Sequence, residues 1–263
     1  MNYRDVRGKA FGIVRKVWQK CARKSVDLLW RVRLAYLYGK TMKSNNKDDA
    51  YRRLSFEEMR RLSEFNGGAL ASDISHFLKN DPQRNSSFQE WWFARGEPEG
   101  KFDLSLKIYQ VLNELLERKE NVRSLIDLGC NSGAVVYEAM QRGINAVGVD
   151  LPLIIDRITL PIKAIAMDLN REFPSGTFDI ILCREVFEHV SDADAFWEGC
   201  NRIAHRGTIL LLSCPYTRRQ FENNAFHLRI LSRDELRDAI ERHGFVAREI
   251  FCEHESYVVV AEK

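Results

Sequence analysis

The chain lacks long apolar runs: no segment approaches the roughly 18–20 residues that a membrane-spanning helix requires. No uninterrupted apolar segment follows the early basic residues, so we also expect no signal peptide. Proline, with 6 of 263 residues, and glycine, with 15, are too scarce for a fibrous or largely disordered protein. The 6 cysteines form no C-x-x-C pair and no disulfide-framework spacing, which favours free thiols in a reducing cytosol. We therefore expect a globular, cytoplasmic protein.

Positive charge is concentrated at the N-terminus. Residues 1–61 contain 17 Lys and Arg against 6 Asp and Glu, a net charge of +11, whereas residues 62–263 carry a net charge of −8. A basic N-terminal segment (the basic head) followed by an acidic remainder (the body) indicates two parts of the chain with different partners. We therefore expect a basic, mostly helical extension over residues 1–100, with a polar linker at 39–50, followed by a second domain over residues 101–263.

Segment 11–38 has the apolar periodicity of a helix, and basic residues fill much of the rest, which predicts a basic amphipathic helix. Its apolar stripe consists of Val14, Val17, Trp18, Cys21, Leu28, Leu29, Val32 and Ala35. In one interpretation the stripe packs on the body of the protein. In the other, the helix lies on an anionic membrane surface, at the inner face of a membrane, where each Lys or Arg contributes about 1 kcal/mol. Nucleic acid is a poorer match, because the body offers no basic groove.

Short apolar segments alternate with helical ones in the second half of the chain. The predicted strands are 124–128, 144–150, 162–167, 178–183 and 207–213, and a closing hairpin is predicted from 245–252 and 257–261. The predicted helices are 55–65, 104–116, 134–142, 191–204 and 232–243, the last two opening on capping boxes at Ser191-Asp194 and Ser232-Glu235. Segment 80–100 has the composition of a loop. This alternation predicts an α/β fold with a parallel sheet, to which the hairpin adds one antiparallel strand.

The loop after the first predicted strand carries the strongest binding signal. Ligands of parallel sheets bind at the carboxyl ends of the strands, where segment 127–133 (Asp-Leu-Gly-Cys-Asn-Ser-Gly) lies. Gly129 and Gly133 allow close approach of the backbone to a ligand. Asp150, which ends the second predicted strand, is placed to accept hydrogen bonds from two ribose hydroxyls.

A dinucleotide is the competing ligand for such a loop. Its fingerprint requires glycine where this chain has Asn131 and Ala134, so NAD is disfavoured. The carboxylate of Asp127, just before the loop, favours a ligand that carries a positive charge.

Four ordered motifs resemble those of class I S-adenosylmethionine-dependent methyltransferases. They are Leu125-Ile-Asp-Leu-Gly-Cys-Asn-Ser-Gly133, Val147-Gly-Val-Asp-Leu151, Ala166-Met-Asp-Leu169 and Phe178-Asp-Ile-Ile-Leu-Cys-Arg-Glu-Val-Phe-Glu-His-Val190. The resemblance covers roughly residues 104–263. It implies a Rossmann-like fold with a seven-stranded, mainly parallel sheet whose last strand is antiparallel, and S-adenosylmethionine as cofactor.

The resemblance also implies which residues contact the cofactor. Around its methionine part it places Gly129, Cys130 and Gly133, at the ribose Asp150, and beside the adenine Met167 and Asp168. Cys183 and Glu185 would border the methyl-transfer site. The full expected set is Asp127, Gly129, Cys130, Asn131, Gly133, Asp150, Leu151, Met167, Asp168, Leu169, Cys183 and Glu185. The family usually has glycine at the position of Asn131, but asparagine tolerates left-handed backbone well.

The segment after the fourth predicted strand bears on the acceptor. Enzymes that methylate base amino groups have an Asn/Asp-Pro-Pro-aromatic motif there, and cytosine-C5 enzymes have a nucleophilic Cys near a proline; neither is present. Segment 185–189 (Glu-Val-Phe-Glu-His) instead resembles the E-x-x-E-H segment of ubiquinone-biosynthesis O-methyltransferases and of small-RNA 2′-O-methyltransferases. This resemblance implies methyl transfer to an oxygen, in preference to a nitrogen, of a small-molecule, glycan or lipid-linked acceptor.

Two interpretations of this segment stay open. In those families the matching side chains hold Mg²⁺, which here implies Glu185, Glu188 and His189, with His227 as a fourth member. Without a metal, which is the interpretation adopted here, the catalytic residues are His189, His227 and Glu188, and either imidazole is suited to take a hydroxyl proton.

Two other functions are also compatible with the sequence. The basic head would suit an RNA 2′-O-methyltransferase, and a degenerate site would suit a non-catalytic, membrane-associated protein of methyltransferase fold. Intact Gly129, Gly133, Asp150 and Asp168 argue against the second. Ahead of the fold, segment 91–93 (Trp-Trp-Phe) is either an apolar lid over the site or an anchor that packs the N-terminal region.

Overall fold

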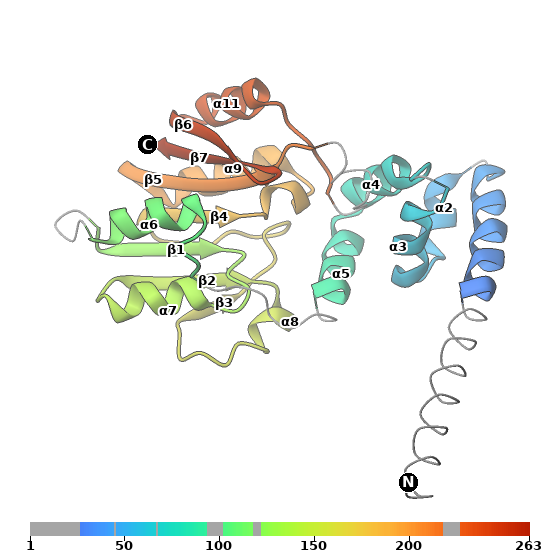
Figure 1. Cartoon of the computed structure of the whole chain (residues 1–263), viewed down its shortest axis with the longest axis horizontal. Helices are drawn as coiled ribbons and strands as arrows, with labels where there is room; N and C mark the ends of the chain where they lie inside the picture. The colour runs from blue at the N-terminus through green and yellow to red at the C-terminus, as the bar shows by residue number, and fades with distance from the viewer. Residues whose placement is uncertain (1–26, 45, 67, 94–101, 118–121, 218–226) are drawn as a thin grey trace, which may run out of the picture.

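The computed structural model describes residues 27–44, 46–66, 68–93, 102–117, 122–217 and 227–263. A group of helices precedes a twisted sheet that is covered by helices on both faces (Figure 1). No helix within these ranges is long and apolar enough to cross a membrane. Five of the six cysteines lie within them, and all five are free thiols, as predicted.

The N-terminal helices enclose an apolar core of their own. They comprise helical residues 27–42 and helices α2 (Lys47–Arg52), α3 (Phe56–Glu64), α4 (Ala71–Asn80) and α5 (Pro82–Phe93). Tyr51, Met59, Leu62, Phe77 and Phe88 are among its fully buried side chains. This burial is the main stabilising contribution to helices that are too short to be stable alone.

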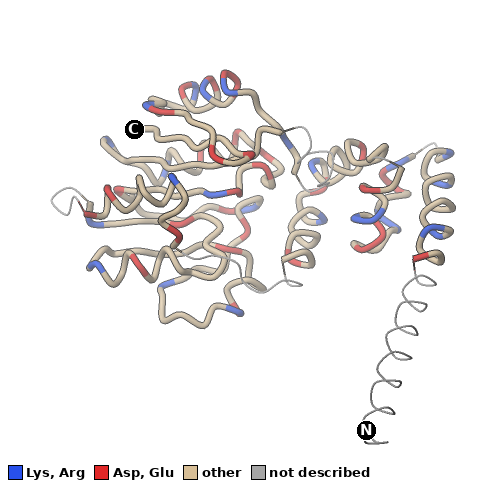
Figure 2. The backbone as a smooth tube through the Cα atoms, viewed as in Figure 1, with Lys and Arg blue, Asp and Glu red and all other residues tan. Residues whose placement is uncertain are grey.

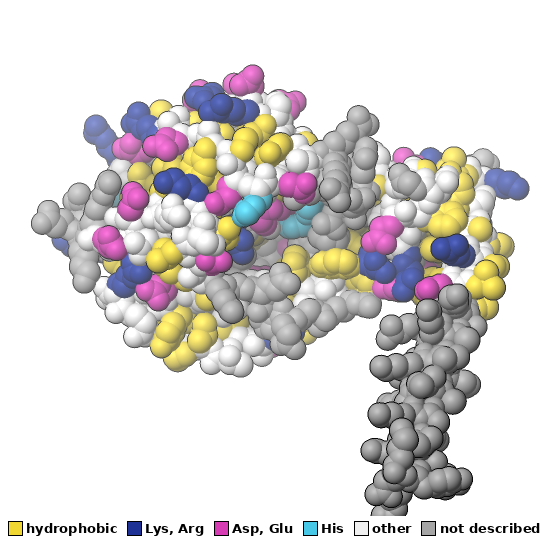
Figure 3. Space-filling model, viewed as in Figure 1, with side chains coloured by type: hydrophobic (Ala, Val, Ile, Leu, Met, Phe, Trp, Pro, Cys, Tyr) yellow, Lys and Arg dark blue, Asp and Glu magenta, His cyan; other side chains and the backbone are white. Residues whose placement is uncertain are grey.

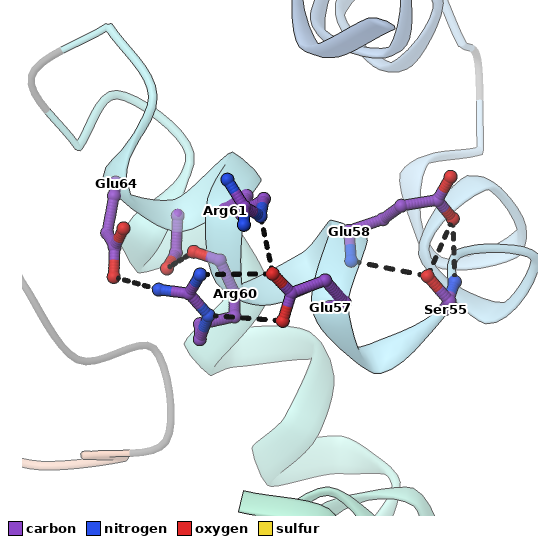
Figure 4. A network of polar contacts seen from close by, with 7 residues as sticks. Ser55, Glu57, Glu58, Arg60, Arg61 and Glu64 are labelled. Atoms are coloured by element: carbon purple, nitrogen blue, oxygen red, sulfur yellow. Dashed lines mark hydrogen bonds and ion pairs between the residues drawn. The ribbon is translucent and has the colours of Figure 1, made fainter. Parts of the chain in front are cut away.

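Side-chain pairs fix the start of α3 and its exposed face (Figure 4). Ser55 and Glu58 form a capping box, in which the Ser55 amide donates to Glu58 Oε2 at 2.8 Å and the Glu58 amide donates to Ser55 Oγ at 3.3 Å. Glu57 accepts from both Arg60 and Arg61 one turn later. Acidic and basic residues therefore follow one another along this helix, whose charged positions are coloured in Figure 2.

Two segments of this region differ from the sequence-based prediction. Segment 39–50, expected as a linker, is mostly helical. Residues 39–42 end the preceding helix, and Asn46 caps α2 by accepting from the Asp49 amide. Within segment 80–100, expected as a loop, Pro82–Phe93 forms α5. Asp81 accepts from the Arg84 amide at 3.1 Å, and proline is tolerated in a first helical turn, where its missing N–H is not needed.

The sheet has seven strands in the order β3-β2-β1-β4-β5-β7-β6. They are β1 (Ser124–Leu128), β2 (Asn145–Asp150), β3 (Ala164–Ala166), β4 (Phe178–Arg184), β5 (Ala204–Pro215), β6 (Val246–Glu253) and β7 (Ser256–Glu262). Only β7 runs against its neighbours, being antiparallel to both β5 and β6. The predicted α/β class, the strand number and the reversed last strand are thus confirmed.

Helices cover both faces of the sheet. Successive side chains of a strand point to opposite faces, so each strand packs against helices on both sides. Leu125 packs with α6 (Lys107–Glu117) and α7 (Ala134–Gln141), whereas Ile126 packs with α9 (Ala193–Arg202) and α11 (Arg233–Arg242). The capping box of Ser232 and Glu235 opens α11 as predicted. The box predicted at Ser191 is wrong: α9 is capped by Asp192, which accepts from the Ala195 amide.

Candidate active site

A cavity of about 300 Å³ lies at the carboxyl ends of the central strands. Strand β1 pairs with β2 on one side and β4 on the other, so the loops after these three strands meet at one edge. Ten of the twelve residues expected to contact a cofactor line this cavity: Asp127, Gly129, Cys130, Asn131, Asp150, Leu151, Met167, Asp168, Leu169 and Glu185. The other two do not: Gly133 precedes α7, and Cys183 is buried in the core.

The loop after β1 is a tight turn fastened to β2. Gly129, Asn131 and Gly133 have φ values of 79°, 45° and 75°, in the left-handed region. The amides of Gly129 and Cys130 both donate to the Val149 carbonyl, at 2.8 and 3.1 Å. A side chain at Gly129 would be strained by this φ and would also collide with Val186. Asparagine occupies the left-handed conformation expected for position 131.

Asp150, at the end of β2, is hydrogen-bonded to this loop. Its two carboxylate oxygens accept from the amides of Asn131 and Leu151, each at 2.8 Å, and burial raises its pKa to about 6. Each oxygen keeps a second lone pair for a ligand. The carboxylate is therefore held rigidly at the rim of the cavity, as a ribose-binding acid requires.

Asp127 lies at the floor of the cavity with 4% of its surface exposed. Burial raises its pKa to about 7, an effect that the positive charge of Arg184 opposes. The Arg184 guanidinium stacks on Tyr109, 5.4 Å from the ring centroid, and both side chains line the cavity. Neither Arg184 nor Tyr109 was predicted from the sequence; the signal for Arg184 is its position at the carboxyl end of β4.

The segment after β4 carries the predicted catalytic residues. It contains a short 3-10 helix, η1 (Phe187–His189), and Glu185 before it accepts from Ser213 Oγ at 2.8 Å. Burial, together with the charge of Glu185, raises the pKa of Glu188 well above its ordinary value. In the described part of the chain, neither carboxylate oxygen of Glu188 accepts a hydrogen bond.

Glu188, His189 and His227 form one buried cluster. Their potential ligand atoms all lie within 4.8 Å of one another, with His189 Nε2 3.6 Å from Glu188 Oε1. The two imidazole rings have centroids 5.0 Å apart, and His189 lines the cavity. On the face of the molecule drawn in Figure 3, histidine side chains (cyan) lie next to acidic ones (magenta). The three residues predicted as catalytic are therefore together, whereas Glu185 of the alternative metal set lies outside the cluster.

Helix α5 and Arg229 hold this segment in place. The side-chain amides of Asn85 and Gln89 both donate to the His189 carbonyl, each at 2.8 Å. Arg229 donates to the carbonyls of Phe187 and Ser191. Three hydrogen bonds thus fix the main chain of η1, and a fourth fixes Ser191 just after it.

The aromatic segment at the end of α5 combines both expected roles. Trp91 and Trp92 pack against the N-terminal core, as an anchor would. Phe93 lines the cavity and meets His189 edge to face, with centroids 6.1 Å apart. The helix therefore anchors the N-terminal region and contributes an apolar wall to the site.

Comparison with known proteins relates this fold and site to one family. The family model described as a methyltransferase domain matches residues 103–250, more than half of the chain. A ubiquinone biosynthesis O-methyltransferase from Pseudomonas aeruginosa is 30% identical over 102 residues, which cover 35% of this chain and 44% of that protein. Its namesake from Methylococcus capsulatus is 22% identical over 156 residues, or 55% of this chain and 64% of the relative. The chain thus spans about half the length of these curated relatives.

A solved structure supports the same assignment of the fold. The S-adenosylmethionine-dependent methyltransferase from Mesorhizobium loti matches with a TM-score of 0.50 at 15% identity, covering 61% of this chain and all of that one. The sheet order, the glycine loop with Asp150 and the family match agree with one another. The chain therefore belongs to the methyltransferase domain family, and within it to the class I enzymes that take their methyl group from S-adenosylmethionine.

Proposed function

We propose that the chain methylates an oxygen of a small-molecule or lipid-linked acceptor. The observation that carries this proposal is the buried cluster of Glu188, His189 and His227, which reaches the cofactor cavity through His189. A neutral imidazole at this place suits the removal of a hydroxyl proton. The similarity to O-methyltransferases of ubiquinone biosynthesis supports an oxygen acceptor.

The cavity residues divide into groups that suit the parts of S-adenosylmethionine. Asp150 would accept from the two ribose hydroxyls, with Met167 and Asp168 beside the adenine. Asp127 would pair with the ammonium group and Arg184 with the carboxylate of the methionine part. A carboxylate and a guanidinium side by side match the two opposite charges of this amino-acid group. Each charge-assisted hydrogen bond contributes about 1.5–3 kcal/mol to binding.

Catalysis at this site is mainly alignment. The sulfonium of the cofactor supplies an already activated methyl group, so the chain must hold the acceptor oxygen in line with it and exclude water. When the acceptor oxygen receives the methyl group, His189 would take the proton of its hydroxyl. Glu188, with Oε1 3.6 Å from His189 Nε2, would hold the imidazole ring in position for this step. Phe93 and Gln89 on α5 would shield the acceptor side of the cavity.

The product of methyl transfer tests the proposal. Incubation with methyl-labelled S-adenosylmethionine and fractionated hydroxylated acceptors should place the label in a methyl ether, which resists alkali. Mass spectrometry of the product identifies the methylated atom. Label recovered only in alkali-labile esters or in methylamines would contradict transfer to a hydroxyl oxygen. Label in RNA, with strongly salt-dependent RNA binding, would favour the 2′-O-methyltransferase alternative.

A divalent metal ion is a second candidate for activating the hydroxyl. Two imidazoles and a carboxylate suit such an ion, and the buried oxygens of Glu188 lack hydrogen bonds within the described residues. Glu188, His189 and His227 would hold it, and it would lower the pKa of a bound hydroxyl. The guanidinium of Arg229 disfavours binding of a metal ion, because its positive charge already acts on Glu188.

Turnover is expected to be the same with and without EDTA, because Arg229 supplies the positive charge that Glu188 needs. The measurement is the initial rate of S-adenosylhomocysteine formation after dialysis against chelator. A loss of activity that Mg²⁺ or Zn²⁺ restores would instead assign the cluster to a metal ion.

Cofactor affinity is expected to rise with pH up to about 7. Because burial raises the pKa of Asp127 to about 7, the empty protein carries a proton on this group below that pH, and a cationic ligand must displace it. The dissociation constant should therefore fall by up to about tenfold per pH unit until Asp127 is ionised, and then level off.

Titration calorimetry at several pH values measures this dependence. Asp127→Asn should bind more weakly and show a much flatter profile above about pH 6, where Asp150 is ionised as well. A variant profile as steep as that of the unaltered chain would show that another group titrates.

A further inference from the structure

Helical residues 27–42 have two apolar faces. One packs on the N-terminal core through Leu34 and Leu37, with Trp30 beside them. The other contains the described part of the stripe predicted from the sequence, and it does not pack on the described part of the protein. Its large apolar side chains are Leu28, Leu29, Val32 and Tyr36, which are 63%, 70%, 64% and 66% exposed. The interpretation in which this stripe packs on the body is therefore wrong for these residues; Val14, Val17, Trp18 and Cys21 lie outside the described range.

The exposed face is one continuous surface. Steps of four residues relate Leu28, Val32 and Tyr36, which places them in line along the helix, and Leu29 lies beside them. Exposed clusters of large apolar side chains on a protein surface mark interaction sites. Figure 1 shows this helix at the edge of the helical group that is farthest from the sheet, so a broad partner could reach it without covering the sheet.

Basic residues border this surface. Arg31 lies on one side of the stripe, and Arg33 and Lys40 lie on the other; all three are exposed. Arg33 also pairs with Glu58 of α3. Asp27 is the single acidic residue in 27–43, and the sequence of residues 1–43 contains 12 Lys and Arg against 2 Asp and Glu. A partner for this face therefore needs an apolar layer beneath a negatively charged one.

We propose that this face of residues 27–42 binds the surface of an anionic lipid bilayer. A helix with an apolar stripe and flanking cations lies in the plane of the membrane, with its side chains in the acyl boundary and its cations at the headgroups. Helices of the described residues are too short or too polar to span the bilayer, so the attachment is peripheral. The proposal is independent of the methylated acceptor, because it rests on no residue of the cavity.

Vesicle co-sedimentation of the full-length chain tests the proposal. Vesicles of phosphatidylcholine with phosphatidylglycerol should bind the chain at low salt, and vesicles of phosphatidylcholine alone should bind it much less. Added salt should release it, since the electrostatic part is screened. Val32→Glu should weaken binding about tenfold or more, because one valine-sized apolar side chain no longer enters the interface.

A matched substitution separates this surface from general effects of charge. Val246→Glu makes the same change at a side chain that is 48% exposed on β6, and it should bind vesicles like the unaltered chain. Both variants should keep their thermal unfolding temperature and their affinity for S-adenosylmethionine.

Two results would overturn the proposal. One is vesicle binding of Val32→Glu equal to that of Val246→Glu. The other is a dimer of the unaltered chain, seen by light scattering, that Val32→Glu dissociates in the absence of lipid. That result would assign the face to a second copy of the chain.

Discussion

Replacement of His189 by alanine is expected to lower kcat by about 100- to 10,000-fold, the usual contribution of a general base. His189 lines the cavity, and no other imidazole of the described residues does. The Asn85 and Gln89 amides bond to the main-chain carbonyl of residue 189, which alanine retains, so the loop should keep its position. Steady-state kinetics with the identified acceptor gives kcat, and calorimetry should show unchanged cofactor affinity.

The exposed His76 on α4 provides the control, since it lies outside the cavity. His76→Ala should retain the full kcat. A kcat within about threefold of the unaltered chain would mean that His189 takes no proton from the acceptor.

Asp150→Ala is expected to weaken binding of S-adenosylmethionine by about 2–4 kcal/mol, or roughly 30- to 1000-fold, because two charge-assisted hydrogen bonds to the ribose are lost. The chain should remain folded, since Asp150 ends β2 at the rim of the sheet. Calorimetric titration measures the change.

Asp156, which is exposed just beyond α8 (Pro152–Ile155), gives the matched comparison. Asp156→Ala should bind the cofactor like the unaltered chain. Equal affinities of the two variants would remove Asp150 from the ribose site and leave the glycine loop as an ordinary tight turn.

Most of the sheet could be predicted, because the burial of each strand is visible in its own short stretch of sequence. Successive residues such as Leu125 and Ile126 are both buried, which is typical of a strand covered on two faces. The start of α11 was equally local, since the two partners of its capping box, Ser232 and Glu235, are three residues apart.

Local patterns failed where one residue had two possible uses. Asp81-Pro82 is a common turn sequence, but here it opens α5, whose burial of Phe88 outweighs the low helical propensity of the segment. Ser191 had the spacing of a helix cap, but its hydroxyl accepts instead from Asn85, 106 residues earlier. Such a contact leaves no trace in the local sequence.

The candidate site shows the same division. Asp127 and Asp150 could be predicted, because Asp127 lies near the end of β1, just before the glycine loop, and Asp150 ends β2. Asn85, Gln89 and Arg229 could not, since they act through main-chain carbonyls of η1 and come from elements far along the chain. The two faces of residues 27–42 were also beyond the sequence, because both carry large apolar side chains and only packing decides which is covered.

A crystal structure of the full-length chain with S-adenosylhomocysteine tests the central claim most directly. We expect the product to fill the cavity at the ends of β1, β2 and β4. Its two ribose hydroxyls should donate to Asp150, its amino-acid end should lie between Asp127 and Arg184, and its sulfur should face His189. A product bound elsewhere, or one whose sulfur is turned away from His189, would contradict the account.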